Sequence, residues 1–297
     1  MSIAGFKVID FHVHIQPWRQ LKPEVRALWQ RYHPDFDALL ALADDPRKFI
    51  ALLDQQGIER AALINYVSPE VMGFSNQVNE FIAAYCKEFP QRLIPCGSLH
   101  PGSAGDVAAR MSYLVRELGI RMLKIHPPHQ LFYPNDYLAG NEALREIYAQ
   151  AQTYKLPVMI HTGTSIFPAA RVKFANPLCL DDIALDFPEL KIIMAHGGRP
   201  LWMNEAFFLM RRHRNIYLDI SSIPPQNLLN YFPRLELIAE RTLFGSDWPG
   251  PSVPGMRPNV ESFLKLPLSV ENKKRILYDN AQELLDSGPD VSGPSRL

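Results

Sequence analysis

The side chains best suited to chemistry are two histidines near the start of the sequence, His12 and His14, at the end of a short apolar run. Alternate residues of a β-strand project to the same face, so the two imidazoles converge on one point if this segment is a strand. Such a pair can bind a metal ion. A chance His-x-His on an ordinary strand is the alternative explanation, so the interpretation depends on the rest of the chain.

Three later segments have the same sequence pattern, in which an apolar run is followed by a side chain that can bind a metal ion and then by a turn-forming residue. They are 158–163 with His161, 192–198 with His196, and 242–249 with Asp247. A single buried histidine is more often a hydrogen-bonded core residue than a ligand. Coincidence of all these groups is harder to explain by chance, because a parallel barrel brings the C-terminal ends of its strands to one mouth.

The elements that must position these residues are short β-rich apolar runs, separated by stretches with helical periodicity. The expected strands are 6–14, 60–67, 93–99, 121–126, 157–161, 191–196, 215–220 and 242–247. The expected helices include 47–56, 76–88, 106–118, 141–155, 178–187, 202–213, 227–240 and 271–285. Alternating strands and helices indicate a parallel sheet, and eight such units predict an α/β fold, the (β/α)8 TIM barrel.

Segment 17–56 is longer than one barrel helix requires, and Trp18 and Arg19 lie near its start. It leaves the C-terminal end of the first strand, where barrel active sites lie. We therefore predict a helical insertion after strand one that partly forms a lid, the alternative being an insertion packed on the outside of the barrel. Residues 1–286 are expected to form a single domain, and the polar, Pro-rich residues 287–297 a disordered tail.

Composition favours a small-molecule substrate. Lys plus Arg and Asp plus Glu balance at 31 each, which leaves no electrostatic footprint for nucleic acid or an anionic membrane. The three cysteines are widely spaced, so we expect neither disulfides nor a thiolate metal site, and a reducing cytoplasm fits. We expect no signal peptide and no membrane span. The oligomeric state is open, and a homo-oligomer is compatible with the sequence.

Neutral imidazole and carboxylate are donors that suit Zn²⁺, whose catalytic sites keep one position open for water. The predicted ligands of a single ion are His12, His14, His161 and Asp247. Zinc lowers the pKa of bound water to about 7, and Asp247 can take the proton that this water loses. His196 is predicted to orient the water or to polarise the substrate's carbonyl. Mn²⁺ is the alternative metal.

Other polar residues are expected to support the site or to lie away from it. Asp10 shares the inward parity of the two histidines and is predicted to fix the tautomer of a histidine. Asp219, on the seventh strand, either does the same or caps the next turn. The three histidines expected at the surface are His33, His129 and His213.

With these motifs the chain resembles the amidohydrolase superfamily, in the branch of aminocarboxymuconate-semialdehyde decarboxylase and related "amidohydrolase 2" proteins. The family pattern is His-x-His on strand one, His on strands five and six, and Asp on strand eight. The sequence meets it at His12, His14, His161, His196 and Asp247. Segments 195–198 (Ala-His-Gly-Gly) and 244–249 (Phe-Gly-Ser-Asp-Trp-Pro) are close to the family's wording, and the resemblance covers nearly the whole chain.

Lys124, on the predicted fourth strand, bears on the metal count. Binuclear relatives carry a carboxylated lysine there that bridges two metals, and His161 and His196 would complete the second site. The branch that this chain resembles is mononuclear, so the resemblance favours one metal. Lys124 is then a substrate-binding cation or a buried structural lysine. His126 shares a face with Lys124 and is a candidate for substrate contact.

The resemblance implies one of two reactions. Members of this branch either add water to an ester, lactone or amide, or expel carbon dioxide without redox chemistry from an unsaturated or aromatic acid. A decarboxylase must hold a carboxylate, which the guanidinium group matches at both oxygens. Arg199 is the leading candidate, ahead of Arg19 and Arg171, and we also assign Trp18 to substrate binding. Hydrolysis is our first interpretation, decarboxylation the alternative, and a non-catalytic binding barrel the third.

Overall fold

The computed structural model describes residues 1–251 and 253–289, and its centre is one eight-stranded parallel sheet in sequence order. The strands are β1 (Ile9–Val13), β2 (Arg60–Ile64), β3 (Leu93–Gly97), β4 (Met122–Ile125), β5 (Val158–His161), β6 (Ile192–Ala195), β7 (Ile216–Asp219) and β8 (Thr242–Leu243). Each lies inside a predicted strand. The sheet curls until β8 meets β1, where Phe11 N donates to Phe244 O at 2.9 Å. The predicted (β/α)8 barrel is therefore confirmed.

Backbone pairing beyond the strands determines which side chains meet at the mouth. Asp247 N donates to His12 O at 2.8 Å, and His14 N donates to Trp248 O at 2.7 Å. The segment after β8 therefore runs beside the His-x-His segment. On the other side of the barrel His161 pairs with Ala195, the residue before His196.

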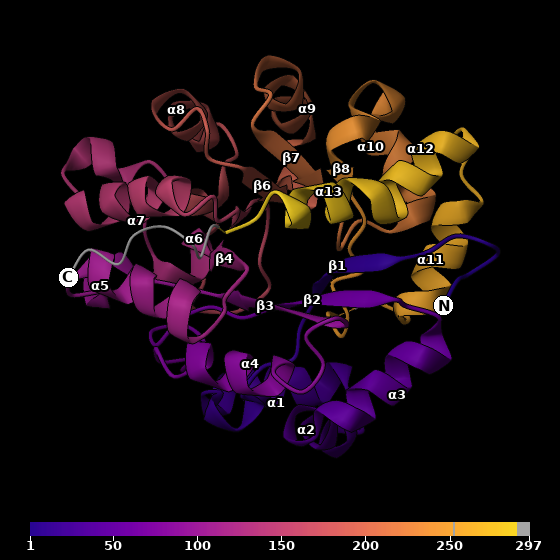
Figure 1. Cartoon of the computed structure of the whole chain (residues 1–297), viewed down its shortest axis with the longest axis horizontal. Helices are drawn as coiled ribbons and strands as arrows, with labels where there is room; N and C mark the ends of the chain where they lie inside the picture. Colours follow the sequence, from indigo (N-terminus) through magenta and orange to yellow (C-terminus); the bar gives the residue numbers. More distant parts are fainter. Residues whose placement is uncertain (252, 290–297) are drawn as a thin grey trace.

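Helices cover the outside of the sheet (Figure 1). They are α1 (Pro23–Tyr32), α2 (Phe36–Asp44), α3 (Pro46–Gln56), α4 (Val78–Cys86), α5 (Val107–Ser112), α6 (Pro127–Gln130), α7 (Glu142–Thr153), α8 (Cys179–Asp186), α9 (Met203–Arg212), α10 (Leu228–Tyr231), α11 (Met256–Leu264), α12 (Val270–Lys274) and α13 (Asn280–Asp286). The other helical segments are 3-10 helices, except for the π-helical η3 and η9. They are η1 (Trp18–Gln20), η2 (Pro101–Ser103), η3 (Tyr113–Glu117), η4 (Asp136–Ala139), η5 (Val172–Ala175), η6 (His196–Gly198), η7 (Pro225–Asn227), η8 (Leu235–Arg241) and η9 (Arg275–Asp279). Their apolar faces and the strands enclose the main core, and a smaller cluster of buried side chains fills the barrel interior.

Local sequence signals explain where some helices begin and end. The Asp45 side chain accepts from Arg47 N at the start of α3, and Gly57 ends the helix with a left-handed φ of 74°. The helix predicted over 227–240 is instead broken into η7, α10 and η8. Pro233 lies in the break and lacks the N–H that a continuous helix needs.

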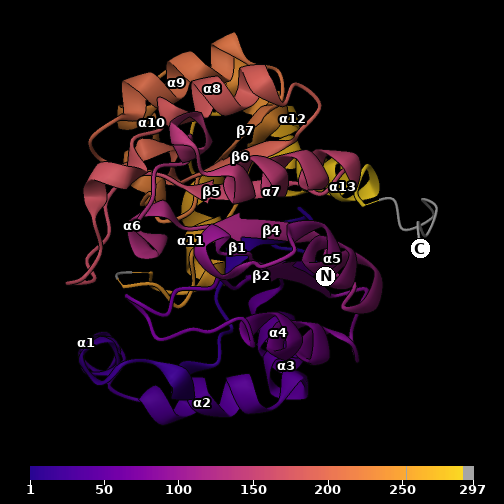
Figure 2. The same cartoon turned by 90° about the vertical axis from the view of Figure 1, so that its left-hand side faces the viewer.

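The segment after β1 forms the predicted helical insertion, η1 with α1 to α3. Figure 2 shows the loop that follows β5 extending on the same side as α1. Trp29 of α1 lies 6.3 Å from Phe167 of this loop, measured between ring centroids. The α1 end of the insertion thus reaches the mouth.

Other expectations concern the rest of the chain. The three cysteines are free, as predicted. The described residues include no helix that is both long and apolar enough to cross a membrane. Most of the predicted tail, residues 290–297, lies outside the described residues. The single-domain assignment stays a prediction.

Candidate metal centre and substrate cavity

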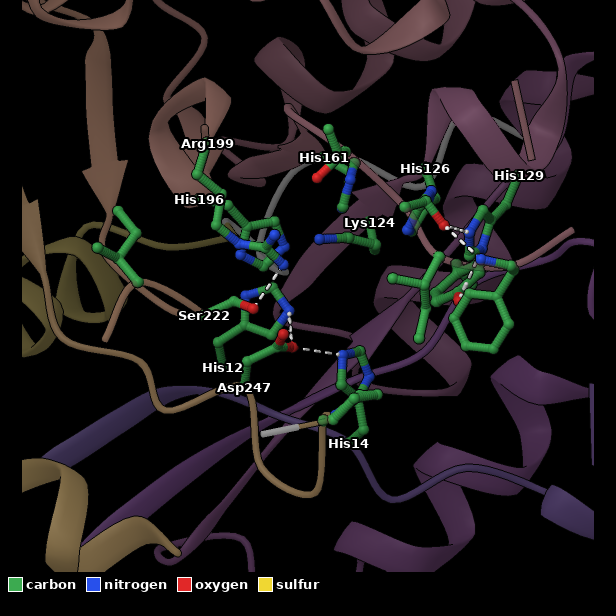
Figure 3. A pocket seen from close by; sticks show the side chains of 18 of the residues that line it. His12, His14, Lys124, His126, His129, His161, His196, Arg199, Ser222 and Asp247 are labelled. Carbon is green, nitrogen blue, oxygen red and sulfur yellow. Dashed lines mark hydrogen bonds and ion pairs between the residues drawn. The ribbon is translucent and has the colours of Figure 1, made fainter. Parts of the chain in front are cut away.

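A cavity of about 410 Å³ opens at the C-terminal ends of the strands. Of the residues singled out in the sequence, it is lined by His12, His14, Lys124, His126, His161, His196, Arg199 and Asp247 (Figure 3). These residues come from five strand ends and the loops that follow them. Two aromatic residues of the insertion, Trp29 and Tyr32, also line the cavity. The insertion therefore forms part of the cavity wall, and its role as a lid stays a prediction.

Asp247 lies at the centre of a histidine cluster. His14 Nε2 is 3.0 Å from Asp247 Oδ1, and His12 Nε2 is 3.5 Å from the same oxygen. Potential ligand atoms of His12, His196 and Asp247 all lie within 4.8 Å of one another. This compact group includes His196, which we predicted to act on the substrate, and does not include His14 or His161. His161 lies next to it, with its ring 4.7 Å from that of His196.

Three of the imidazoles are held at Nδ1 by an oxygen acceptor, so the lone pair of each Nε2 is directed into the cavity. The partners are Asp219 Oδ2 for His12 at 2.5 Å, Ile64 O for His14 at 3.1 Å and Ser221 O for His196 at 3.0 Å. Within the described residues, Nε2 of His12 and of His161 is buried without a hydrogen-bond partner. Unprotonated Nε2 atoms around a carboxylate fit a divalent metal ion.

Asp219 has the function that we expected of Asp10. Its carboxylate accepts from the His12 ring and also from Ser221 N at 2.9 Å, so it both fixes a tautomer and caps a turn. Burial alone would raise the pKa of Asp219, but His12 outweighs this and holds the pKa below its ordinary value. Gly245 allows the approach, because a Cβ there would lie 2.6 Å from His12 Cβ and 2.7 Å from Asp219 Oδ1.

Asp10 instead holds the backbone. Its Oδ1 accepts from Ser246 N at 2.8 Å and from His12 N at 3.3 Å, and it has no hydrogen bond to an imidazole. The pairing register of β1 shifts between Asp10 and Val13, so simple strand alternation does not carry from Asp10 to the histidines. Asp10 contributes by fixing the segment before Asp247.

Backbone strain marks three residues of the cavity. His196, Ser222 and Asp247 have φ values of 64°, 59° and 66°, in the left-handed region that side chains other than glycine rarely adopt. Such strain is concentrated at functional sites. Burial alone would raise the pKa of Asp247, but the surrounding imidazoles of His14, His12 and His196 hold it well below its ordinary value. Asp247 is thus a carboxylate, as a ligand must be.

Lys124 and His126 extend the cavity along β4. Burial lowers the pKa of Lys124 to about 8, and its Nζ has no hydrogen-bond partner among the described residues. His126 is stacked between two imidazoles, with centroid distances of 4.0 Å to His161 and 3.6 Å to His129. Burial, and to a smaller extent the neighbouring His129 and His161, keep the pKa of His126 well below its ordinary value, so its ring is neutral.

Arg199 lies in the cavity wall. Trp18 and Arg19, which were also predicted to bind substrate, do not line the cavity. The Arg199 guanidinium donates to Ser222 Oγ at 2.5 Å. Arg19 is at the surface, with its side chain 63% exposed and paired with Asp44 at 2.6 Å. Trp18 is fully buried in the core beside Trp29. The prediction that these two bind substrate is therefore wrong, because η1 turns one side chain outward and the other into the core.

His129 is the main cavity residue that the sequence analysis missed. It was expected at the surface but is 1% exposed, and its ring contacts Tyr66 Oη at 3.1 Å and Ser165 Oγ at 2.7 Å. The signal was its three-residue spacing from His126, which one helical turn, α6, converts into a ring stack. His213 is also buried and bonds Asp181, and His33 is half-buried against Trp29.

The profile of the Amidohydrolase family matches residues 9–286, so the chain belongs to this family. It is therefore a (β/α)8-barrel enzyme of the amidohydrolase superfamily. The sequence has no significant match among curated proteins.

Solved structures support the fold. An uncharacterized TIM-barrel protein from Bordetella bronchiseptica is 24% identical with a TM-score of 0.76, covering 95% of this chain and 99% of its own. A 5-carboxyvanillate decarboxylase from Sphingomonas paucimobilis is 16% identical with a TM-score of 0.63, covering 95% and 99%. A dihydroxybenzoic acid decarboxylase from Polaromonas sp. JS666, with bound manganese and the inhibitor 2-nitroresorcinol, is 20% identical with a TM-score of 0.66, covering 96% and 97%.

Proposed function

We propose that the chain is a metal-dependent decarboxylase that releases carbon dioxide, without redox chemistry, from an aromatic or unsaturated carboxylic acid. The observation that carries the proposal is the half-buried guanidinium of Arg199 in the same cavity as the histidine and aspartate cluster. Burial lowers the pKa of Arg199, and the nearby Asp247 acts in the opposite direction. The names of the similar decarboxylases favour the same reaction.

His12, His14, His161 and Asp247 would hold one divalent ion. A bound ion of this kind supplies positive charge that can orient and polarise a substrate oxygen. The donor set suits Zn²⁺, and Mn²⁺ is the alternative that a similar decarboxylase contains.

Arg199 would bind the reacting carboxylate through its two-pronged guanidinium. Decarboxylation breaks the bond between this carboxylate and the adjacent carbon, and the carbon that keeps the electron pair must receive one proton. We assign this proton delivery to His196, which would take the proton from water and pass it to that carbon, while Asp247 holds the ion. Lys124 and His126 would line the remainder of the substrate site.

Hydrolysis of a lactone, ester or amide, our first interpretation of the sequence, becomes the second candidate. The same cluster could activate water, but hydrolysis gives no particular use to a guanidinium in the wall of the same cavity. The similar solved enzymes named above for their reaction are decarboxylases.

The reaction can be decided with a substrate panel. Hydroxybenzoic and unsaturated acids should release carbon dioxide when mixed with the metal-loaded protein, whereas lactones, esters and amides should release no acid above background. Carbon dioxide and acid release should be measured on the same samples, with heat-denatured protein as control. Hydrolysis of a panel compound without any carbon dioxide release would make hydrolysis, and not decarboxylation, the better-supported reaction.

Metal content provides a second test. We expect one equivalent of divalent metal per chain by elemental analysis, and loss of activity after chelation. Two equivalents, together with a carbamate on Lys124 detected by mass spectrometry or carbon-13 NMR, would contradict the mononuclear assignment. Full activity in chelated, metal-free protein would exclude the proposed centre.

A further inference from the structure

The side of the cavity that carries His129 contains a chain of hydrogen bonds that the proposed chemistry does not use. It runs through Tyr66, His129 and Ser165, all of which line the cavity. Tyr66 Oη lies 3.1 Å from His129 Nδ1, and Ser165 Oγ lies 2.7 Å from His129 Nε2. Ser68 Oγ donates to His129 O at 3.0 Å, which holds the backbone of the same residue.

The direction of these hydrogen bonds follows from their donors and acceptors. A phenol O–H is a better hydrogen-bond donor than its oxygen is an acceptor, and Tyr66 Oη lies 3.1 Å from His129 Nδ1. The phenol therefore donates its hydrogen to His129 Nδ1. Burial lowers the pKa of His129 to about 3, so the ring is neutral and carries its single N–H at Nε2.

In this arrangement the Ser165 hydroxyl keeps one hydrogen-bonding group that is not in use. Its oxygen accepts from His129 Nε2 at 2.7 Å and from Phe167 N at 3.4 Å. A hydroxyl has two lone pairs and one hydrogen, so both acceptor positions are occupied and only the O–H remains. Phe167 also packs edge-on against His129, at a centroid distance of 5.2 Å, which fixes the loop over the cavity.

We propose that Ser165 is a specificity-determining residue that donates a hydrogen bond to an oxygen substituent of the substrate. Figure 3 shows His129 and Arg199 on opposite sides of the cavity, with Lys124 between them. Because Ser165 contacts His129, the substituent it recognises lies away from the carboxylate bound by Arg199. This inference rests on the proposed function, and it narrows the substrate class to acids with a second oxygen group, such as hydroxyl or methoxy, remote from the reacting carboxylate.

The test uses binding of probes that cannot lose carbon dioxide. The probes are 2-nitrophenol and its derivatives with hydroxyl, methoxy or methyl at ring carbon 4, 5 or 6, in which the nitro group takes the place of the carboxylate. Calorimetry on metal-loaded protein should show, at one ring position, the methoxy probe binding about fivefold more tightly than the methyl probe, the typical effect of one neutral hydrogen bond. Ser165→Ala should reduce this ratio to about one, and Ser165→Thr, which keeps the hydroxyl, should restore it.

Thr164→Ala is the matched control, because Thr164 is the adjacent hydroxyl residue of the cavity wall, and the ratio should stay at its wild-type value. An unchanged ratio in Ser165→Ala, an equal loss in Thr164→Ala, or no preference in the wild-type protein would each overturn the assignment. The substrate panel separates this inference from the proposed function. Carbon dioxide release with a preference independent of Ser165 removes only the inference, whereas a Ser165-dependent preference without carbon dioxide release contradicts only the reaction.

Discussion

His196→Asn is expected to lower turnover by about two to four orders of magnitude, the usual effect of losing an acid-base group, and to leave the metal content near that of the wild type. His196 Nδ1 is held by Ser221 O, which leaves Nε2 free to exchange a proton in the cavity. Asparagine retains a polar group of similar reach but cannot carry a proton between pH 5 and 8. Turnover and metal content should be measured on the same preparation.

His161→Asn is the matched variant, and it should deplete the metal as well as the activity. His161 Nε2 is buried without a hydrogen-bond partner in the described structure, as expected of a ligand. Equal metal loss in both variants would assign His196 to the ligand set. That outcome has a structural basis, because the most compact group in the cavity consists of His12, His196 and Asp247.

Arg199→Ala is expected to reduce kcat/KM for carbon dioxide release by about 30-fold to several thousand-fold, the range for removing one partner of a buried charged contact. The loss arises because the substrate carboxylate would enter a half-buried site without its cation. Arg199→Lys keeps the charge but not the two-pronged geometry, so it should recover only part of the activity.

Arg19→Ala is the control for this experiment, because Arg19 is exposed, pairs with Asp44 and lies outside the cavity. Its kcat/KM should equal that of the wild-type protein. Wild-type kcat/KM in Arg199→Ala would exclude Arg199 from carboxylate binding. An equal loss in Arg19→Ala would show that the effect is not specific to the cavity.

The sequence by itself determined the barrel and the residues at its mouth. Strand and helix periodicity are local properties, and a polar residue that ends an apolar strand, such as His161 or Asp247, must lie at the C-terminal end of a parallel barrel. Eight strands and the helical insertion could therefore be predicted. The helix expected over 227–240 failed at Pro233, although the local signal was present in the sequence.

Only the tertiary structure decided how each polar group is satisfied. His12 bonds Asp219, which is 207 residues away, rather than its near neighbour Asp10, because the β1 register shift and the small Gly245 determine which carboxylate reaches the ring. His129 follows two prolines in a polar segment, yet one turn of α6 buries it against His126. Periodicity specifies the face of a strand, whereas a hydrogen-bond partner depends on register and packing between distant segments, which no local pattern records.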